Sequence, residues 1–317
     1  MEKESKFISL VVYLHDNEKE IDEFLNTVVN AIDQKFSKYE LVCVDDQASE
    51  ELKDKVVSFI KDNHINAMVN MVHMSYYQGL EASMNAGRDL AIGDFVFEFD
   101  TTFVDYDPSV ISECYESLLK GFDIVAARSK GKQRFFSKMF YRIYNTYSKS
   151  GNNKLANDSL RILSRRAINR AKSMGTSIPY RKAVYANSGL KIGTVMYEPK
   201  KGVRGQRKST GHMSLALDSF VYFTTFLEKI SAVLSCVFLL ATLGIVAYIL
   251  ADVFMHHNTA DGWLSIMGFL SLGFLGIFVL LSIVMRYLST LINVVFRQQN
   301  YLISDIEKIV SGDSKND

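Results

Sequence analysis

Two long uncharged runs constrain the fold of this chain more than any other feature of its sequence. Of the 317 residues, those at 230–251 and 262–285 include no Asp, Glu, Lys or Arg. Each run exceeds the roughly 20 apolar residues that a helix needs to cross the core of a bilayer. Buried helices of a soluble protein are the alternative, but two such continuous runs separated only by residues 252–261 favour two membrane spans. The sequence therefore predicts a multi-pass protein of the cell (cytoplasmic) membrane.

Basic residues near the ends of the two runs predict the orientation of the chain, because cytoplasmic flanks retain Lys and Arg. The connector between the runs has neither, so we expect both termini in the cytoplasm. The predicted organisation is a cytoplasmic domain at 1–210, an amphipathic juxtamembrane segment at 211–229, two transmembrane helices with a short external loop at 230–285, and a cytoplasmic tail at 286–317. The flanking basic residues are Lys200, Lys201, Arg204, Arg207, Lys208 and Lys229 before the first run, and Arg286 and Arg297 after the second.

Charge and cysteine content exclude two kinds of ligand. The net charge of +1 argues against nucleic acid as a partner, since nucleic-acid-binding domains are usually strongly basic. The three cysteines, Cys43, Cys114 and Cys236, have no metal-ligand spacing, so we expect them to be reduced packing residues.

Glycines in the second uncharged run provide small surfaces that permit a homo-oligomer, namely Gly268, Gly273 and Gly276.

The N-terminal part of the chain alternates between short apolar runs and segments with helical periodicity. This order predicts an α/β domain whose mostly parallel sheet is covered by helices on both faces. The expected strands are Phe7–Leu14, Tyr39–Val44, Ala67–Met74, Asp94–Phe99 and Phe122–Ala127, and the expected helices are Asn17–Ile32, Glu50–Lys61, Leu80–Ala91 and Pro108–Leu119.

Carboxylates follow two of the expected strands. Asp45 and Asp46 end the second strand, Asp100 follows the fourth, and Asp105 and Asp107 lie in the loop after it. In parallel sheets, ligands collect at the carboxyl ends of the strands. Carboxylates there hold a divalent cation or accept hydrogen bonds from ribose and base groups. Because Asp is also common in helix caps and turns, this pattern alone leaves a structural role open.

An ordered set of motifs makes the functional interpretation more specific. The set consists of Ile8–Tyr13 followed by Glu18, Tyr39–Asp46, Gly79-Leu80-Glu81-Ala82, Ala86-Gly87, Gly93-Asp94, Asp100, Leu160–Arg166 and Leu215–Phe220. It resembles glycosyltransferase family 2, and within that family the polyprenyl-phosphate sugar synthases, which also end in two membrane spans. The resemblance covers essentially the whole chain.

The resemblance implies a Rossmann-like GT-A domain that binds a nucleotide diphosphate sugar over the strand ends. Asp45 and Asp46 would face the base and ribose, with Gly79 also in the nucleotide-sugar site. Asp100 would lie beside the diphosphate and a divalent cation, Mg²⁺ or Mn²⁺. The family's Asp-x-Asp followed by Gln is reduced here, since Thr102 and Val104 replace two of the usual ligands. Asp105 or Asp107 could substitute as a metal ligand if the loop bends, and metal binding stays open.

Arginines in the Leu160–Arg166 segment are the expected catalytic cations beside Asp100. A guanidinium matches phosphate oxygens bidentately, so Arg161 and Arg165 are suited to holding the diphosphate. Surface charge is the alternative role for both. Further cations that could replace the metal follow the fifth strand, namely Arg128, Lys130, Lys132 and Arg134.

The implied reaction is transfer of a hexose, with inversion, from a nucleotide diphosphate sugar to a polyprenyl phosphate such as undecaprenyl phosphate at the cytoplasmic membrane face. A phosphate acceptor is already anionic, so stabilisation of the leaving group should dominate catalysis. Arg204, Arg207 and Lys208 precede an apolar, aromatic segment and are expected to attract the lipid phosphate. A simple positive-inside anchor would explain the same charges.

Two other functions are compatible with parts of the sequence. A catalytically degenerate relative could serve as a binding or regulatory subunit of a cell-envelope glycan assembly complex, and Gln47, Thr102 and Val104 favour this alternative. A processive polysaccharide synthase is disfavoured, because such enzymes carry a Gln-x-x-Arg-Trp motif and the single Trp, Trp263, lies in the second uncharged run.

Overall fold

The structure is a computed structural model that describes most of the N-terminal domain, one long helix and a C-terminal strand. The described residues are 3–16, 19–63, 65, 67–131, 141–142, 144–146, 158–174, 180–200, 263–296 and 301–309, with the isolated positions 233, 237, 240, 244 and 247. Several predicted features lie outside these residues: the juxtamembrane segment 211–229, most of the first uncharged run, Cys236, and the basic residues Lys132, Arg134, Arg204, Arg207 and Lys208.

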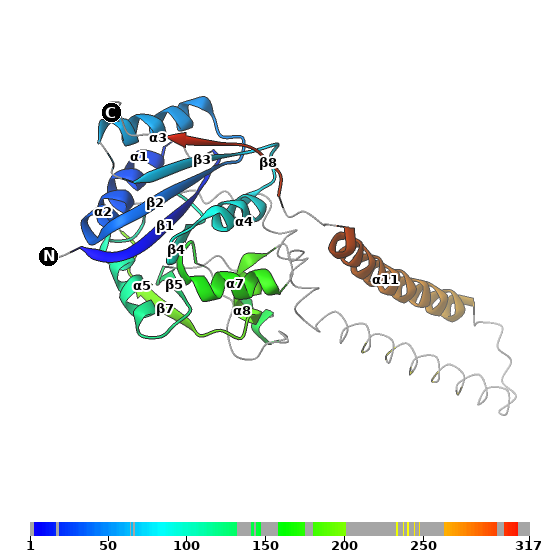
Figure 1. The fold of residues 1–317 in the computed structure, drawn as a ribbon. Coiled ribbons are helices and arrows are strands. Elements are labelled where there is room, and N and C mark those ends of the chain that lie inside the picture. Colours follow the sequence, from blue (N-terminus) through cyan, green and yellow to red (C-terminus); the bar gives the residue numbers. More distant parts are fainter. Residues whose placement is uncertain are drawn as a thin grey trace, which may run out of the picture.

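A single mixed sheet forms the centre of the domain (Figure 1). Its strand order is β7-β5-β6-β4-β1-β2-β3-β8. Neighbouring strands are parallel except where β6 pairs with β4 and β5 and where β8 pairs with β3. The prediction of a mostly parallel α/β sheet is confirmed. The strands are β1 Glu4–Leu14, β2 Phe36–Asp45, β3 Met68–Met74, β4 Phe95–Phe99, β5 Ile124–Ser129, β6 Leu160–Ser164, β7 Ile192–Tyr197 and β8 Ile303–Ile309.

Helices cover both faces of the sheet, as the alternating pattern predicts. The first predicted helix is built from α1, a π-helical turn at Leu25–Val29 and α2, and the next three predicted helices match α3, α4 and α5 closely. The described helices are α1 Ile21–Phe24, α2 Asn30–Lys35, α3 Glu50–Asp62, α4 Leu80–Leu90, α5 Ser109–Leu119, α7 Arg165–Ser173, α8 Arg181–Asn187 and α11 Trp263–Phe296.

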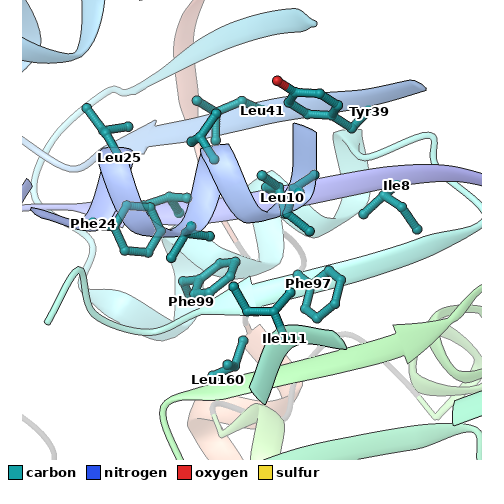
Figure 2. Packing of buried hydrophobic residues seen from close by; sticks show 14 of the residues in the cluster. Ile8, Leu10, Phe24, Leu25, Tyr39, Leu41, Phe97, Phe99, Ile111 and Leu160 are labelled. Carbon is teal, nitrogen blue, oxygen red and sulfur yellow. The ribbon is translucent and has the colours of Figure 1, made fainter. Parts of the chain in front are cut away.

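Alternation along β1 explains the two hydrophobic layers. Ile8 and Leu10 face one layer, in which Phe24 and Ile111 cover the strands, while Val11 faces the other. Figure 2 shows the first layer, with side chains from helices packed on those of β1, β2 and β4. Because successive side chains of a strand point to opposite faces, a strand covered by helices on both sides is mostly apolar. The carboxyl ends of β1, β2 and β4 are thereby fixed at one edge of the domain.

Gly93 provides a test of how closely the chain packs at the start of β4. A Cβ atom at this position would lie 2.6 Å from the backbone nitrogen of Ser9 and 2.9 Å from the carbonyl carbon of Ile8. Backbone atoms of a central strand cannot move aside, so we expect Gly93→Ala to lower the free energy of unfolding by about 1–3 kcal/mol. Thermal unfolding measures this. Gly131→Ala, which would meet only side-chain atoms at 3.2–3.4 Å, is the matched control, and equal melting temperatures for the two variants would contradict the packing.

The C-terminal segment differs most from the prediction. Residues 303–309 were expected in a cytoplasmic tail, but they form β8 and pair with β3, with Val69 opposite Ile309 and His73 opposite Asp305. A charged strand at the edge of a sheet carries little hydrophobic pattern, which is why the sequence did not indicate it. The sheet domain is therefore completed by a strand that follows α11 in the chain.

α11 is a 34-residue helix that stands apart from the sheet domain in Figure 1. It contains the second predicted span and continues beyond it to Phe296. Within the described part of the chain, no helix qualifies by length and apolar character as a membrane span. The two predicted spans are not confirmed. Many large apolar side chains of α11 are exposed, among them Ile266, Leu270, Leu272, Phe274, Ile277, Leu281, Val284, Met285, Leu288 and Leu291.

Candidate active site

The acidic residues predicted from the sequence meet at the carboxyl edge of the sheet. Asp45 is the last residue of β2, Asp46 follows it, and Asp100 follows β4. Both strands pair in parallel with β1, so their ends lie at the same edge. This is the edge at which α/β sheets bind ligands.

Asp46 holds the loop before α4 in place. Its two carboxylate oxygens accept hydrogen bonds from the backbone N–H groups of Gln78 and Gly79, both at 2.8 Å. The Tyr13 hydroxyl donates to the same carboxylate at 3.0 Å. Burial, with the charge of Asp46, raises the pKa of Tyr13 far above its usual range, so this phenol stays a donor. Gly79 immediately precedes α4 and has a φ of +82°, a positive value that suits glycine. The structure thus brings Asp46 and Gly79 together.

Asp45 is similarly engaged within the protein. One carboxylate oxygen accepts from the backbone N–H of Ala48 at 2.7 Å. The other lies 2.7 Å from Nδ1 of His73 and 3.4 Å from Nζ of Lys53. Both Asp45 and Asp46 are buried. The structure therefore places both carboxylates beneath the edge, where they fix the loops that form its surface.

Asp100 lies in a buried cluster of ion pairs. Arg161 donates to its carboxylate at 2.7 Å, Arg181 donates at 2.8 Å, and Nζ of Lys182 lies 3.4 Å away. The carboxylate of Glu98, which lies in β4 and points to the same face, is 2.8 Å from Arg161 and 2.9 Å from Arg181. Asp158 completes the group. We call these six residues the arginine cluster: Glu98, Asp100, Asp158, Arg161, Arg181 and Lys182.

The charges of the arginine cluster stabilise one another. Burial alone would raise the pKa of Asp100, but the attraction of Arg161, Arg181 and Lys182 outweighs it and holds that pKa well below its usual range. The same balance of burial against the arginines lowers the pKa of Glu98. Both carboxylates are therefore charged at neutral pH. Arg161 and Arg181 are each 1% exposed, whereas the side chain of Lys182 is 12% exposed and reaches nearest to the surface.

The structure separates the two arginines that the sequence grouped as catalytic. β6 runs antiparallel to β4, with Leu160 opposite Phe99 and Ser164 opposite Phe95. Arg161 therefore lies at the carboxyl end of β4 beside Asp100. Arg165 lies at the opposite end, where its guanidinium donates to the backbone carbonyls of Ala91 and Gly93. From this position Arg165 holds the backbone at the start of β4 and lies away from the edge where a phosphate would bind.

The sequence did not indicate Arg181 and Lys182, which lie 2.8 Å and 3.4 Å from the Asp100 carboxylate. They come from α8, and no spacing links that helix to β4. One signal was available: Glu98 interrupts the apolar strand Phe95–Phe99, and Arg161 interrupts the apolar strand Leu160–Ser164. Charged residues are almost never fully buried without a partner, so these two interruptions indicate a buried ion pair. Lys130, a predicted replacement cation, instead pairs with Glu198 at 3.0 Å on the surface.

The described residues do not fit a divalent-cation site at Asp100. Its carboxylate is already bonded to two guanidinium groups, and Thr102 and Val104 are buried. The Asp105 carboxylate accepts from the Tyr197 hydroxyl at 2.7 Å, and Asp107 accepts from a backbone N–H at the start of α5. Across the described ranges no three His, Cys, Asp or Glu side chains form a group that could hold a metal. Mg²⁺ and Mn²⁺ need several free oxygen ligands, which these residues do not offer.

A mostly parallel sheet covered by helices on both faces, with acidic groups at its carboxyl edge, is an α/β domain of the Rossmann-like type. The profile described as Glycosyl transferase family 2 matches residues 9–175, more than half of the chain, and the chain belongs to this family. It is a glycosyltransferase that uses a nucleotide-sugar donor, as the resemblance predicted.

Similar proteins extend the comparison beyond the matched residues. An uncharacterized glycosyltransferase of Synechocystis is 24% identical over 94% of this chain and 95% of its own length. A prophage bactoprenol glucosyl transferase homolog of Escherichia coli is 26% identical over 85% of this chain and 88% of its own. An undecaprenyl-phosphate 4-deoxy-4-formamido-L-arabinose transferase of Proteus mirabilis is 23% identical over 94% and 93%.

A solved structure supports the fold. The mannosyltransferase of Pyrobaculum calidifontis, in complex with GDP-Man and Mn²⁺, superimposes with a TM-score of 0.50 over 93% of this chain and 89% of its own, at 12% identity. At this identity the likeness shows the GT-A fold alone. A divalent cation is compatible with that fold, although the residues of this chain around Asp100 do not fit one.

Proposed function

We propose that this glycosyltransferase moves a sugar from a nucleotide diphosphate sugar to a polyprenyl phosphate at the cytoplasmic face of the membrane. The observation that carries the proposal is the extent of the similarity. The match to the undecaprenyl-phosphate transferase covers 94% of this chain, and therefore includes regions beyond the sheet domain. The carboxyl edge of the sheet, with its fixed loops and its arginine cluster, supplies a donor site of the right kind.

The nucleotide binds over the loops that Asp45 and Asp46 fix. Exposed aromatic rings there offer a stacking surface for a base, since Tyr76 and Tyr77 are each about half exposed and the His15 ring lies 4.8 Å from that of Tyr77. The two aspartates act through the positions of these loops. We expect the diphosphate to lie toward Asp100, at the end of β4, which is separated from β2 by β1 alone.

The arginine cluster stabilises the leaving nucleoside diphosphate. As the bond to the sugar breaks, negative charge grows on the diphosphate, and fixed cations nearby lower the barrier electrostatically. Lys182 is the cation of the cluster nearest to solvent, while Arg161 and Arg181 hold Asp100 and Glu98 behind it. The phosphate acceptor is already anionic, so a single displacement with inversion at the anomeric carbon needs little assistance from a general base.

The region around α11 brings the domain to the lipid. The exposed apolar side chains of α11 and the uncharged runs at 230–251 and 262–285 support association with a bilayer. β8 belongs to the same sheet as the N-terminal strands, so a chain that crosses the bilayer once between β7 and β8 would have to cross it a second time before β8. Two spans with both termini in the cytoplasm satisfy this requirement. Arg204, Arg207 and Lys208 would then lie where they attract the lipid phosphate.

A comparison of undecaprenyl phosphate with undecaprenol tests whether the acceptor is a lipid phosphate. The purified full chain in detergent is incubated with radiolabelled UDP and GDP sugars and either lipid. We expect label in the lipid phase only with the phosphate-bearing lipid, because the acceptor oxygen belongs to the phosphate. Equal transfer to undecaprenol, or transfer only to water-soluble acceptors, would contradict the proposed acceptor.

Donor binding without a divalent cation tests the role of the cluster. We expect the dissociation constants for UDP and GDP, measured by calorimetry, to differ less than about threefold between a solution with Mg²⁺ and one with EDTA. About 5 mM Mg²⁺ is enough to saturate a typical site. Loss of nucleotide binding in EDTA would show that a cation binds at Asp100 after all. Lys182→Ala should weaken binding about tenfold, since it removes a charge-assisted contact. Lys191→Ala, on the surface before β7, is the control.

The degenerate binding subunit remains the second candidate, and one observation favours it. The three cations of the arginine cluster are matched by its three acids, and Arg181 also pairs with Glu81, so this part of the site has no surplus positive charge. Tight nucleotide binding without transfer to any lipid would identify this function.

A further inference from the structure

The strand that follows α11 is bonded directly to the loop that Asp46 holds. The Gln78 side chain makes two reciprocal hydrogen bonds with the backbone of Leu302: Nε2 donates to the carbonyl at 2.6 Å, and Oε1 accepts from the N–H at 2.8 Å. The backbone N–H of Ser75 donates to the same carbonyl at 3.0 Å. The backbone N–H of Gln78 meanwhile donates to Asp46. One residue therefore joins the C-terminal segment to the acidic edge.

Further contacts join β8 to its surroundings at the same edge. The imidazole of His73 lies between Asp45, 2.7 Å from Nδ1, and Glu307 of β8, 3.6 Å from Nε2. The hydroxyl of Ser304 donates to the His73 carbonyl at 3.1 Å. Tyr301 donates to Asp89 on α4 at 3.1 Å. The segment 301–309 thus contacts residues that bond to Asp45 and Asp46, and it also contacts α4.

We propose that β8 is a positioning element of the donor site, and that Gln78 is the positioning residue through which the docked strand sets the loop 75–79. This inference rests on the proposed function for its consequence in catalysis. Six residues separate the end of α11 from the start of β8. The position of the helix therefore limits where β8 docks, and the loop that shapes the nucleotide site is ordered when the strand is in place.

The arrangement has a physical reason. The loop at 75–79 has few apolar anchors, since Tyr76 and Tyr77 are exposed, so its conformation depends on its hydrogen bonds. Asp46 restrains it from the β2 side and Leu302 restrains it from the β8 side. Without the second restraint, the loop pays part of its ordering entropy when a nucleotide binds, which weakens affinity without altering the chemistry at Asp100.

Gln78→Ala in the full chain tests the coupling. Hydrogen exchange of the ligand-free protein should show faster exchange in the peptide that covers 75–79, with β1 and β4 unchanged. The dissociation constants for UDP and GDP should rise about three- to tenfold, the effect of one or two ordinary hydrogen bonds. In the transfer assay, the KM for the donor should rise with kcat nearly constant. Gln78→Glu keeps the shape of the side chain but sets an acceptor against the Leu302 carbonyl, so it should not restore the wild-type values.

Removal of the strand and its return provide the second arm. A chain that ends at residue 300 should show the same changes more strongly, and a synthetic peptide of residues 301–309 should reverse them. Lys308→Ala, an exposed position of β8, is the matched control and should match the wild type. Unchanged exchange at 75–79 in Gln78→Ala would overturn the inference, whether or not the truncated chain folds. If the wild type binds neither nucleotide, the proposed function fails, while the exchange measurement still decides the coupling.

Discussion

Arg161→Leu is expected to lower the free energy of unfolding by about 3–5 kcal/mol and to abolish sugar transfer. The guanidinium of Arg161 contacts three carboxylates, Glu98, Asp100 and Asp158, at 2.7–3.2 Å. Removing it leaves buried charge without its partner, which is among the costliest single changes in a protein. Chemical denaturation measures the stability loss. Arg166→Ala, whose side chain is 75% exposed beside Asp123, is the control and should stay within about 0.5 kcal/mol of the wild type.

The effect of Arg161→Leu should depend on pH in a defined direction. The arginines depress the pKa values of Glu98, Asp100 and Asp158 in the folded state. A carboxyl whose folded pKa is depressed stabilises the fold at pH above its unfolded pKa, about 4, and loses that contribution as the pH falls through the folded value. The difference between wild type and variant should therefore be largest near neutral pH and shrink below about pH 4. A difference that grows toward acid would contradict the charge assignment.

Asp46→Ala is expected to have the second largest effect, chiefly on nucleotide binding. It removes the acceptor for the N–H groups of Gln78 and Gly79 and for the Tyr13 hydroxyl. A buried hydrogen bond to a charged group contributes about 1.5–3 kcal/mol, so we expect a stability loss of that order. The loop at 75–79 loses its main restraint, and the affinity for UDP or GDP should fall more than tenfold.

Asp46→Asn separates charge from geometry in the same experiment. The amide of Asn keeps one oxygen that accepts from the loop but presents an NH₂ group to the remaining donors. The stability of the Asp46→Asn protein should therefore lie between those of the wild type and Asp46→Ala. Nucleotide affinity is read by calorimetry and stability by denaturation. An Asp46→Ala protein with wild-type affinity would show that the loop 75–79 takes no part in nucleotide binding.

The central fold was predictable because its strands are buried on both faces. The first five strands and four helices have clear apolar periodicity, and each was predicted within a few residues of its observed bounds. β6, β7 and β8 were not predicted, and the reasons differ for β6 and β8. β6 is short and contains Arg161, whose charge is neutralised only by residues far away in sequence. β8 is charged and exposed at the edge, and its partner β3 lies more than 220 residues earlier in the chain.

The site was predictable where it follows strand ends and not where helices contribute. Asp45 ends β2, Asp46 follows it, and Asp100 follows β4. Both strands are parallel to β1, which lies between them, so the parallel topology alone brought the three residues to one edge. Arg165 was misplaced because the antiparallel direction of β6, which the sequence did not show, sends it to the other end of β4. Arg181 and Lys182 had no pattern linking them to Asp100. Their contribution depends on how α8 packs on the sheet, which is a tertiary property.

The most direct test of the account is transfer of a labelled sugar to undecaprenyl phosphate by the purified full chain in the presence of EDTA, with Arg161→Leu as the inactive comparison. We predict label in the lipid phase with one of the UDP or GDP sugars, at a rate that added Mg²⁺ or Mn²⁺ changes little. Transfer that requires a divalent cation would contradict the role given to the arginine cluster. No transfer from any donor by a folded, nucleotide-binding protein would contradict the enzyme itself and leave the binding subunit as the function.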